Sequence, residues 1–337
     1  MTPYVQATVT LLRLVASEGL SLMLLVEIPW AGRVWALPFL TVLAPSERYD
    51  QERGHRHKTL TDWGRQMLRQ IRRWLPEQKI FVVADSSFAA FNLLAAVSQM
   101  TNPVHVVTRL RLDAALYKPA APRHKGQMGR PRHKGARLPN LTTVLTDPKT
   151  QWQTVIVNSW YGGEEREVEL VSDTAVWYHT GMPAVPIRWV LVRDPQEKFK
   201  PQAFLCTNLT VAPLQILQWF VQRWQVEVTF EEVRAHLGVE TQRQWSDKAI
   251  ARTTPALLGL FSLVTLLAHH MQPQPQIPVR QSAWYLKPLP TFVDALALVR
   301  QSLWPCTLFH TSQQQTDMVK VPRALLECWV DTLCYAA

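Results

Sequence analysis

The sequence predicts an α/β protein in which a mixed sheet is flanked by helices, and three features support this. After Lys79, residues 80–84 are continuously apolar, as in a strand buried on both faces, and an Ala/Leu-rich helical segment follows them. Residues 20–28 and 34–43 are apolar runs separated by Pro-Trp-Ala-Gly-Arg, which predicts a β-hairpin. Residues 211–237 have helical apolar periodicity, with a Pro near the start and a Gly after the end.

The composition is that of a globular protein with a polyanionic partner. Of the 337 residues, 47% are hydrophobic and 18% are charged, which excludes global disorder and allows one large core or two domains. The net charge of +10 favours a polyanion as the partner. Residues 20–43 are interrupted by charges and prolines and residues 255–268 are too short to span a bilayer comfortably, so no membrane partner is expected.

Cysteine usage and the opening residues indicate where the protein works. The cysteines are scattered without the close pairs of a zinc site, which favours a reduced, intracellular protein. They are Cys206, Cys306, Cys328 and Cys334. No charged-then-apolar leader opens the sequence, so a cytoplasmic location is expected.

A polar segment and an amphipathic helix follow the predicted hairpin. Residues 48–58 predict a loop, and its His55 and His57 lack a nearby set of metal ligands, so we interpret them as solvated. Residues 59–75 predict a helix with a Thr cap and a stripe of arginines on its polar side. These are Arg65, Arg69, Arg72 and Arg73. The stripe is either a solvated face or a contact with a nucleic-acid backbone, and the sequence favours the solvated face.

The buried strand at residues 79–84 ends at an acid, Asp85, which is followed by Ser-Ser-Phe. Open α/β sheets place their chemistry outside the carboxyl ends of strands, which makes Asp85 a candidate active-site residue. The alternative is that Asp85 or Ser86 only caps the following helix. The residue pattern alone supports both interpretations equally.

A basic low-complexity segment follows the next predicted strand, residues 103–112. Pro-Arg-His-Lys-Gly occurs twice within residues 118–138, which contain several Pro and Gly and no acid, so we predict an extended, mobile loop. Its candidate DNA-binding residues are Arg123, Lys125, Arg130, Arg132 and Lys134. Phosphate contact is favoured over a merely solvated loop, and minor-groove insertion is the less favoured form of contact.

The predicted helix at residues 211–237 carries a constellation of charges. Phe220, Glu227 and Arg234 lie two turns apart on one face, and Arg223 lies one turn before Glu227. This is either a surface ion pair of small energetic value or a metal-binding acid whose cationic neighbours hold phosphate. Spacing alone favours the surface pair.

The full pattern changes that preference. Phe220-x2-Arg223-x3-Glu227-x6-Arg234 resembles the Tyr-x2-Arg-x3-Glu-x6-Lys signature around the last acid of bacterial insertion-sequence transposases with an Asp-Asp-Glu (DDE) active site. Within these, the chain is most similar to the IS4/IS701-like group. It departs from the signature by Phe for Tyr and Arg for Lys. The strand ending at Asp85 resembles the second acid motif of the same group, and the two motifs occur in the expected order.

The resemblance implies an RNase H-like fold whose three acids come from the first strand, the fourth strand and a later helix. Asp85 matches the second acid and Glu227 the third, and both would be catalytic metal ligands for Mg²⁺ or Mn²⁺. Arg223 and Arg234 would contact DNA phosphate or steady the carboxylate. The implied partners are double-stranded DNA at transposon ends and a homodimer mate or partner transposase, in the nucleoid of a prokaryote.

The first acid of this signature has no match. It belongs on a strand before the predicted hairpin, yet no Asp precedes Asp50, and Glu18 does not fit the motif. We therefore expect an N-terminally shortened insertion-sequence transposase that binds metal weakly, if at all, and is catalytically incomplete. The alternatives are a non-catalytic basic DNA-binding protein or modulator of an intact transposase, and an RNase H-like nuclease acting outside transposition.

The expected organisation places two parts of an RNase H-like core around an insertion. Residues 1–117 form the first part, without the strand of the first acid, and residues 118–186 form the basic loop and a mostly β insertion. Residues 187–270 form the second part with the Glu227 helix, and residues 271–337 form a helical extension.

Overall fold

The computed structural model describes residues 7–13, 19–122, 128–129, 132–158, 160–241, 243–244, 246–271, 277–281, 286–308 and 322–335. The chain divides into two compact units. The first contains residues 1–25 and 40–227, and the second contains residues 26–39 and 228–337. Each unit is described by itself.

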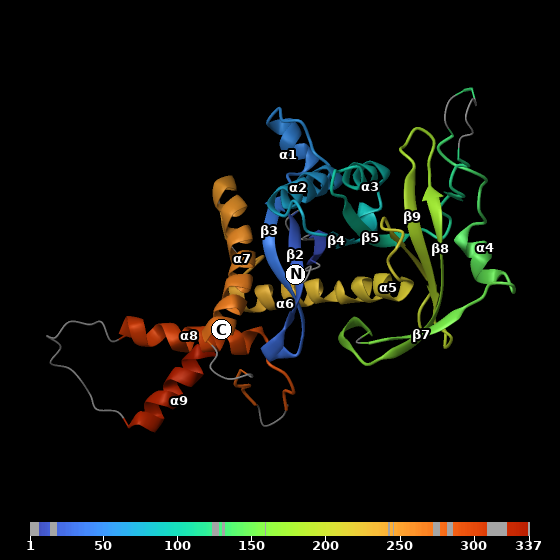
Figure 1. The fold of residues 1–337 in the computed structure, drawn as a ribbon. Coiled ribbons are helices and arrows are strands. Elements are labelled where there is room, and N and C mark those ends of the chain that lie inside the picture. Colours follow the sequence, from blue (N-terminus) through green and yellow to red (C-terminus); the bar gives the residue numbers. More distant parts are fainter. Residues whose placement is uncertain are drawn as a thin grey trace. The chain divides into compact units, whose positions relative to one another are not determined.

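The strands of the described residues join one mixed sheet (Figure 1). They are β1 (Ala7–Arg13), β2 (Gly19–Ile28), β3 (Arg33–Leu43), β4 (Ile80–Ala84), β5 (Val104–Leu110), β6 (Leu116–Tyr117), β7 (Gln153–Val157), β8 (Arg166–Trp177), β9 (Val185–Arg193) and β10 (Gln202–Cys206). Their order is β3-β2-β1-β4-β5-β10-β9-β8-β6, and β7 pairs with β8. The β1–β4 and β4–β5 pairs are parallel, whereas β1–β2 and the pairs from β5 to β8 are antiparallel.

Helices cover the sheet and form much of the second unit. In chain order the helices of the described residues are η1 (Pro29–Ala31), α1 (Glu47–Glu52), α2 (Leu60–Trp74), η2 (Ser86–Phe88), α3 (Phe91–Ser98), α4 (Leu141–Thr146), η3 (Trp160–Gly162), α5 (Pro213–Gln222), α6 (Trp224–Leu237), α7 (Asp247–Met271), α8 (Phe292–Leu308) and α9 (Arg323–Cys334). The prediction of an RNase H-like mixed sheet flanked by helices is confirmed.

The first strand of the sheet, which the sequence analysis expected to be missing, is present. The segment Ala7–Arg13 lies between β2 and β4 and pairs with both. Its mixture of Thr, Leu and Val gave no clear strand signal, because a central strand is specified by its two neighbours as much as by its own residues. The strand contains no Asp or Glu. The strand at the position expected for the first acid is therefore present and offers no carboxylate.

Two apolar layers hold the sheet of the first unit, and alternate residues of β4 belong to different layers. Ile80, Val82 and Ala84 belong to a core that includes residues of α2 and α3. Phe81 and Val83 belong to a second core, which includes residues of α5. In Figure 1, α2 and α3 accordingly lie on one side of β4 and β5, and α5 lies on the other. This strand is buried on both faces, as its continuous apolar sequence predicted.

The segment predicted as a loop at residues 48–58 begins with a helix. Ser46 caps α1 by accepting a hydrogen bond from the Tyr49 amide, and Arg48 pairs with Glu52 one turn later at 2.8 Å. His57 is not simply solvated, because its Nδ1 lies 2.9 Å from Oδ2 of the buried Asp50. Capping and local ion pairs thus order a short helix that apolar periodicity does not reveal.

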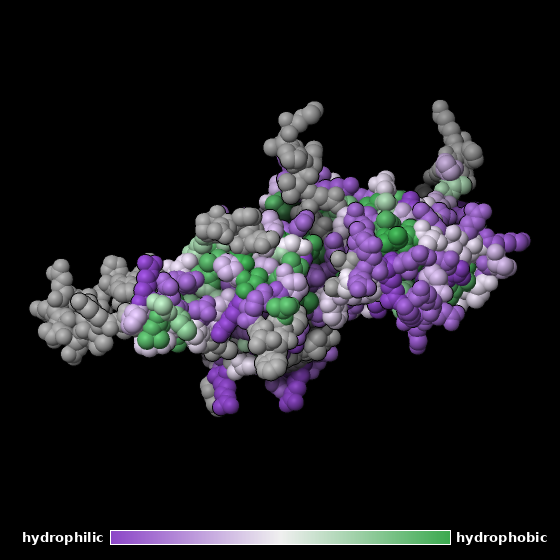
Figure 2. Space-filling model, turned by 90° about the horizontal axis from the view of Figure 1, so that it is seen from below, coloured by the Kyte–Doolittle hydropathy of each residue, from purple (hydrophilic) through white to green (hydrophobic). Residues whose placement is uncertain are grey.

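The second unit is built on the tip of the hairpin and on long helices. Trp35 of β3 packs against Phe261 of α7, and Phe261 stacks on Phe292 of α8 with ring centroids 4.3 Å apart. Helix α7 begins at Asp247, before the apolar run at residues 255–268, and by length and composition alone it could cross a membrane. Apolar side chains on its exposed side include Leu260, Leu263 and Leu267. Green hydrophobic areas are interspersed among hydrophilic ones on the face seen in Figure 2.

Candidate active site

Asp85 lies immediately after β4, at the carboxyl end of a parallel strand. Its carbonyl oxygen accepts hydrogen bonds from the Thr108 hydroxyl at 2.8 Å and the Phe88 amide at 3.0 Å, which fix the backbone. Its side chain is half-buried and does not cap η2, although Asp85 occupies the N-cap position. Capping by the Asp85 side chain is therefore excluded as the reason for this acid. By the alternation along β4, Asp85 faces the side of the sheet on which α5 packs.

Glu227 lies in the first turn of α6 and is paired with Arg223. The predicted helix at residues 211–237 is in fact two helices that meet at Arg223, with Pro213 at the first position of α5 and Gly238 after α6 at a φ of 72°. Arg223 Nη1 lies 3.4 Å from Glu227 Oε1. The arginine side chain is only 13% exposed, whereas that of the glutamate is 42% exposed.

The Arg223–Glu227 pair is more than a solvated surface pair. The Arg223 guanidinium lies 5.4 Å from the centroid of the Phe220 ring, and its buried Nε has no hydrogen-bond partner among the described residues. The pair therefore combines a mostly buried cation, whose Nε–H is enclosed by the protein, with a partly exposed carboxylate.

Arg234 pairs with an acid other than Glu227. Arg234 Nε lies 2.8 Å from Glu240 Oε2 instead. Gly238 and Glu240 both have positive φ, and the Val239 amide donates to the Val233 carbonyl at 3.3 Å. The chain thus turns back at the end of α6 and brings Glu240 to the arginine, which spacing along a helix cannot predict.

The two candidate acids, Asp85 and Glu227, belong to the same compact unit. The described residues contain no direct interaction between Asp85 and Glu227 and no group of three or more His, Cys, Asp or Glu side chains that could hold a metal ion. The pairing of Leu11 with Ala84 places Leu12 level with Asp85 on the neighbouring strand. An apolar residue thus occupies the register position beside the second acid.

The basic segment is closed at its base. The Gly135 and Leu138 amides donate to the carbonyls of Lys118 and Leu116, each at 2.8 Å. Lys134 is held by two aromatic rings, with Nζ 3.8 Å from the Tyr117 centroid and 4.2 Å from the Tyr178 centroid. The prediction of a mobile loop is therefore wrong for this base, because backbone pairing and cation–π contacts order it.

The other candidate residues of the basic segment divide into two groups. Arg132 is exposed, which leaves it available to phosphate. Arg123, Lys125 and Arg130 lie outside the described residues.

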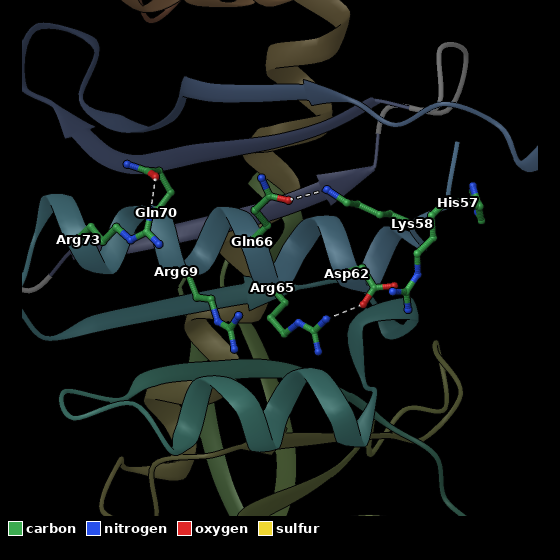
Figure 3. A pocket seen from close by; sticks show the side chains of 9 residues that line it. His57, Lys58, Asp62, Arg65, Gln66, Arg69, Gln70 and Arg73 are labelled. Carbon is green, nitrogen blue, oxygen red and sulfur yellow. Dashed lines mark hydrogen bonds and ion pairs between the residues drawn. The ribbon is translucent and has the colours of Figure 1, made fainter. Parts of the chain in front are cut away.

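The arginine stripe of α2 lines a hollow in the surface. A cavity of about 530 Å³ runs along this helix and is lined mainly by basic and polar side chains, including Arg65, Arg69 and Arg73 (Figure 3). Arg72 does not belong to it, because its guanidinium donates to the carbonyls of Leu75, Gln78 and Pro103. The spacing of four residues between the three lining arginines was the signal that could have separated them from Arg72.

Comparison with known families decides the classification. The model of the DDE superfamily endonuclease family matches residues 4–185, which is more than half of the chain. The chain belongs to the DDE superfamily endonucleases. The matched range of this DDE endonuclease includes β1, the arginines of α2 and Asp85, whereas Glu227 lies outside it.

No curated protein matches this DDE endonuclease. A similar solved structure is a cryo-EM structure of a piggyBac transposase synaptic complex with hairpin DNA, at 9% sequence identity and a TM-score of 0.37. The alignment covers 94% of this chain and 59% of that one, so the DDE endonuclease spans less than two thirds of that chain's length.

Proposed function

We propose that this DDE superfamily endonuclease is a transposase of the insertion-sequence type that binds DNA but is catalytically incomplete. The observation that carries this proposal is the register of β1, where Leu12 lies level with Asp85 and no residue of the strand is acidic. The net charge of +10 and the motif around Glu227 support DNA as the substrate class.

The chemistry explains why one acid matters. Cleavage of a phosphodiester needs a nucleophile, neutralisation of charge at phosphorus and stabilisation of the leaving oxygen, and two Mg²⁺ or Mn²⁺ ions held by carboxylates supply these. Asp85 and Glu227 are the candidate ligands of this chain. They do not make up the donor set of a two-metal site, so weak metal binding is expected.

Arg223 would serve substrate binding independently of a metal. Its guanidinium is held by Phe220 and Glu227, and 13% of the side chain is exposed. A phosphate oxygen that contacts the exposed part would meet a cation that is already oriented, which lowers the entropic cost of contact.

The test is a nicking assay on supercoiled plasmid with Mg²⁺ or Mn²⁺. The wild-type chain is expected to nick no faster than its Glu227→Ala variant. Metal-dependent nicking by the wild type that Glu227→Ala abolishes would overturn the claim of incompleteness.

A gain of metal binding tests the location of the missing acid. Leu12→Asp is expected to bind Mn²⁺ about tenfold more tightly than the wild type or more, because a third carboxylate joins the ligands. The gain should disappear in Leu12→Asp combined with Asp85→Asn, and the uncharged control Leu12→Asn should show none. Titration calorimetry or Mn²⁺ electron paramagnetic resonance measures all three.

The second candidate is a non-catalytic DNA-binding protein that modulates an intact transposase. It is supported by the same acid-free strand together with the basic composition. If Leu12→Asp gains no Mn²⁺ affinity that depends on Asp85, the carboxylates share no site and this second candidate is favoured.

A further inference from the structure

The basic cavity along α2 carries much more positive than negative charge. Its cationic side chains are Arg56, Lys58, Arg65, Arg69 and Arg73, and its acidic side chain is Asp62. In Figure 3, Arg65 and Arg69 extend from one side of the helix, and Lys58 lies near its N-terminal end. A concave surface with this imbalance attracts anions.

The one acid is already engaged by Arg65, whereas other arginines of the cavity lack a close partner among the described residues. Asp62 completes the capping box of α2 with Thr59 and pairs with Arg65 at 2.8 Å. Among the described residues, Arg56 and Arg69 have no hydrogen-bond or ion-pair partner, and Arg73 has only a long contact of 3.5 Å with Gln70. Structural contacts therefore do not account for Arg69 and account only weakly for Arg73, whereas hydrogen bonds to backbone carbonyls do account for the neighbouring Arg72.

The arginines are arranged as a row. Arg65, Arg69 and Arg73 follow at intervals of four residues, roughly 6 Å along the helix axis. Arg69 and Arg73 also line an adjoining cavity of about 540 Å³ together with Ala96 and Gln99, at the end of α3. The row thus continues from one hollow into the next, which suits a linear polyanion with evenly repeated charges.

The row ends at the same edge of the sheet as Asp85, although α2 covers the face opposite to the one on which the Asp85 side chain lies. Helix α2 leads from the end of β3 to the start of β4. The hairpin makes β3 antiparallel to β2, β2 is antiparallel to β1, and β1 is parallel to β4, so β3 runs parallel to β4. The N-terminal end of α2 therefore lies at the sheet edge where β4 ends and Asp85 follows. The η2 turn that begins after Asp85 packs against α2.

We propose that Arg65, Arg69 and Arg73 bind the sugar–phosphate backbone of double-stranded DNA and guide it to the edge occupied by Asp85. This inference rests on the proposed DNA-binding function and adds the surface that performs it. Guanidinium groups suit this task because they remain charged and contact phosphate with paired donors.

The experiment measures DNA affinity against salt concentration with the full chain and a short fluorescent duplex. The stripe variant carries Arg65→Gln, Arg69→Gln and Arg73→Gln. The matched control removes the same charge through Arg111→Gln, Lys149→Gln and Arg323→Gln, which are exposed and outside the cavity. Each phosphate contact contributes about 0.9 to the steepness of the slope of log K, the binding constant, against log salt concentration. The slope of the stripe variant should therefore be shallower than that of the wild type by about 2.7.

The outcomes separate this inference from the function on which it rests. We expect the stripe variant to bind about tenfold more weakly or worse, with the shallower slope, whereas the control keeps the wild-type slope. Unchanged thermal unfolding of both variants confirms that they fold. A wild type that binds no DNA refutes the proposed function, whereas a stripe variant that binds like the control refutes only this surface. Tighter binding of duplex RNA than of DNA would refute the choice of partner.

Discussion

His105 should make the first unit sensitive to mild acid. Its ring lies on β5 with its centroid 5.1 Å from that of Phe81, and Asn208 Nδ2 donates to its Nε2 at 3.2 Å. Burial, with the positive charges of Lys79 and Arg72, lowers the pKa of His105 to about 4. The accepted hydrogen bond agrees with this, because an Nε2 that accepts must be unprotonated.

The magnitude follows from linkage. In the unfolded chain His105 titrates near its ordinary pKa of 6.5. Between that pH and about 4 the unfolded state therefore binds a proton at His105, whereas the folded state does not. Stability is therefore fully present above about pH 6.5, falls as the pH decreases toward about 4, and falls no further from this group below it. Between about pH 7 and pH 4.5 the loss is about 2.5 kcal/mol.

The assay compares urea unfolding of the wild type and His105→Gln, followed by tryptophan fluorescence, over this pH range. The difference in unfolding free energy between the two should change by about 2.5 kcal/mol in favour of the variant as the pH falls. Lys79→Met should give an intermediate change, because removing this positive charge raises the pKa of His105. Parallel pH curves for wild type and His105→Gln would show that the histidine protonates freely in the folded state.

Three further changes test local packing. A Cβ at Gly135 would lie 2.6 Å from a backbone oxygen, so Gly135→Ala should open the base of the basic segment. Hydrogen exchange at the Lys118 amide, which donates to the Ala136 carbonyl, should then be faster, and unchanged exchange would contradict this. Gly259 lies inside α7 with open space around it, so Gly259→Ala should raise stability by up to about 1 kcal/mol, and a lower melting temperature would mean that the site is covered. Thr59→Ala removes the capping box with Asp62 and should cost about 1 kcal/mol, whereas Thr59→Ser should retain most of it.

Local signals in the sequence predicted the elements that hold the candidate acids. The continuous apolar run before Asp85 could only be a buried strand, and the structure buries all five residues of β4. Pro213 and Gly238 marked the limits of the helical segment that contains Glu227, because Pro fits the first helical position and Gly tolerates a positive φ.

Contacts that depend on turns and on pairing between elements could not be predicted in this way. The partner of Arg234 is Glu240, which reaches it only because the chain reverses after α6. Lys134 contacts Tyr117 and Tyr178, one on each side of it in the sequence and the second more than forty residues away. Periodicity describes a residue's own element, whereas these contacts are decided by turns and by pairing between elements.

The presence of β1 changes how the loss of an acid is to be understood. A sheet without this strand would leave β2 and β4 with unpaired backbone groups at the centre of the first unit, which is costly. Replacing a single acid beside Asp85 has the opposite effect on stability, because it removes repulsion between neighbouring carboxylates. One substitution in β1 would therefore suffice for the proposed loss of activity, while the strand order, both cores and the arginine row of α2 remain. The proposed DNA-binding surface would be kept as well, so Leu12→Asp, which adds a single carboxylate beside Asp85, is the smallest change that tests whether these residues can form an active site.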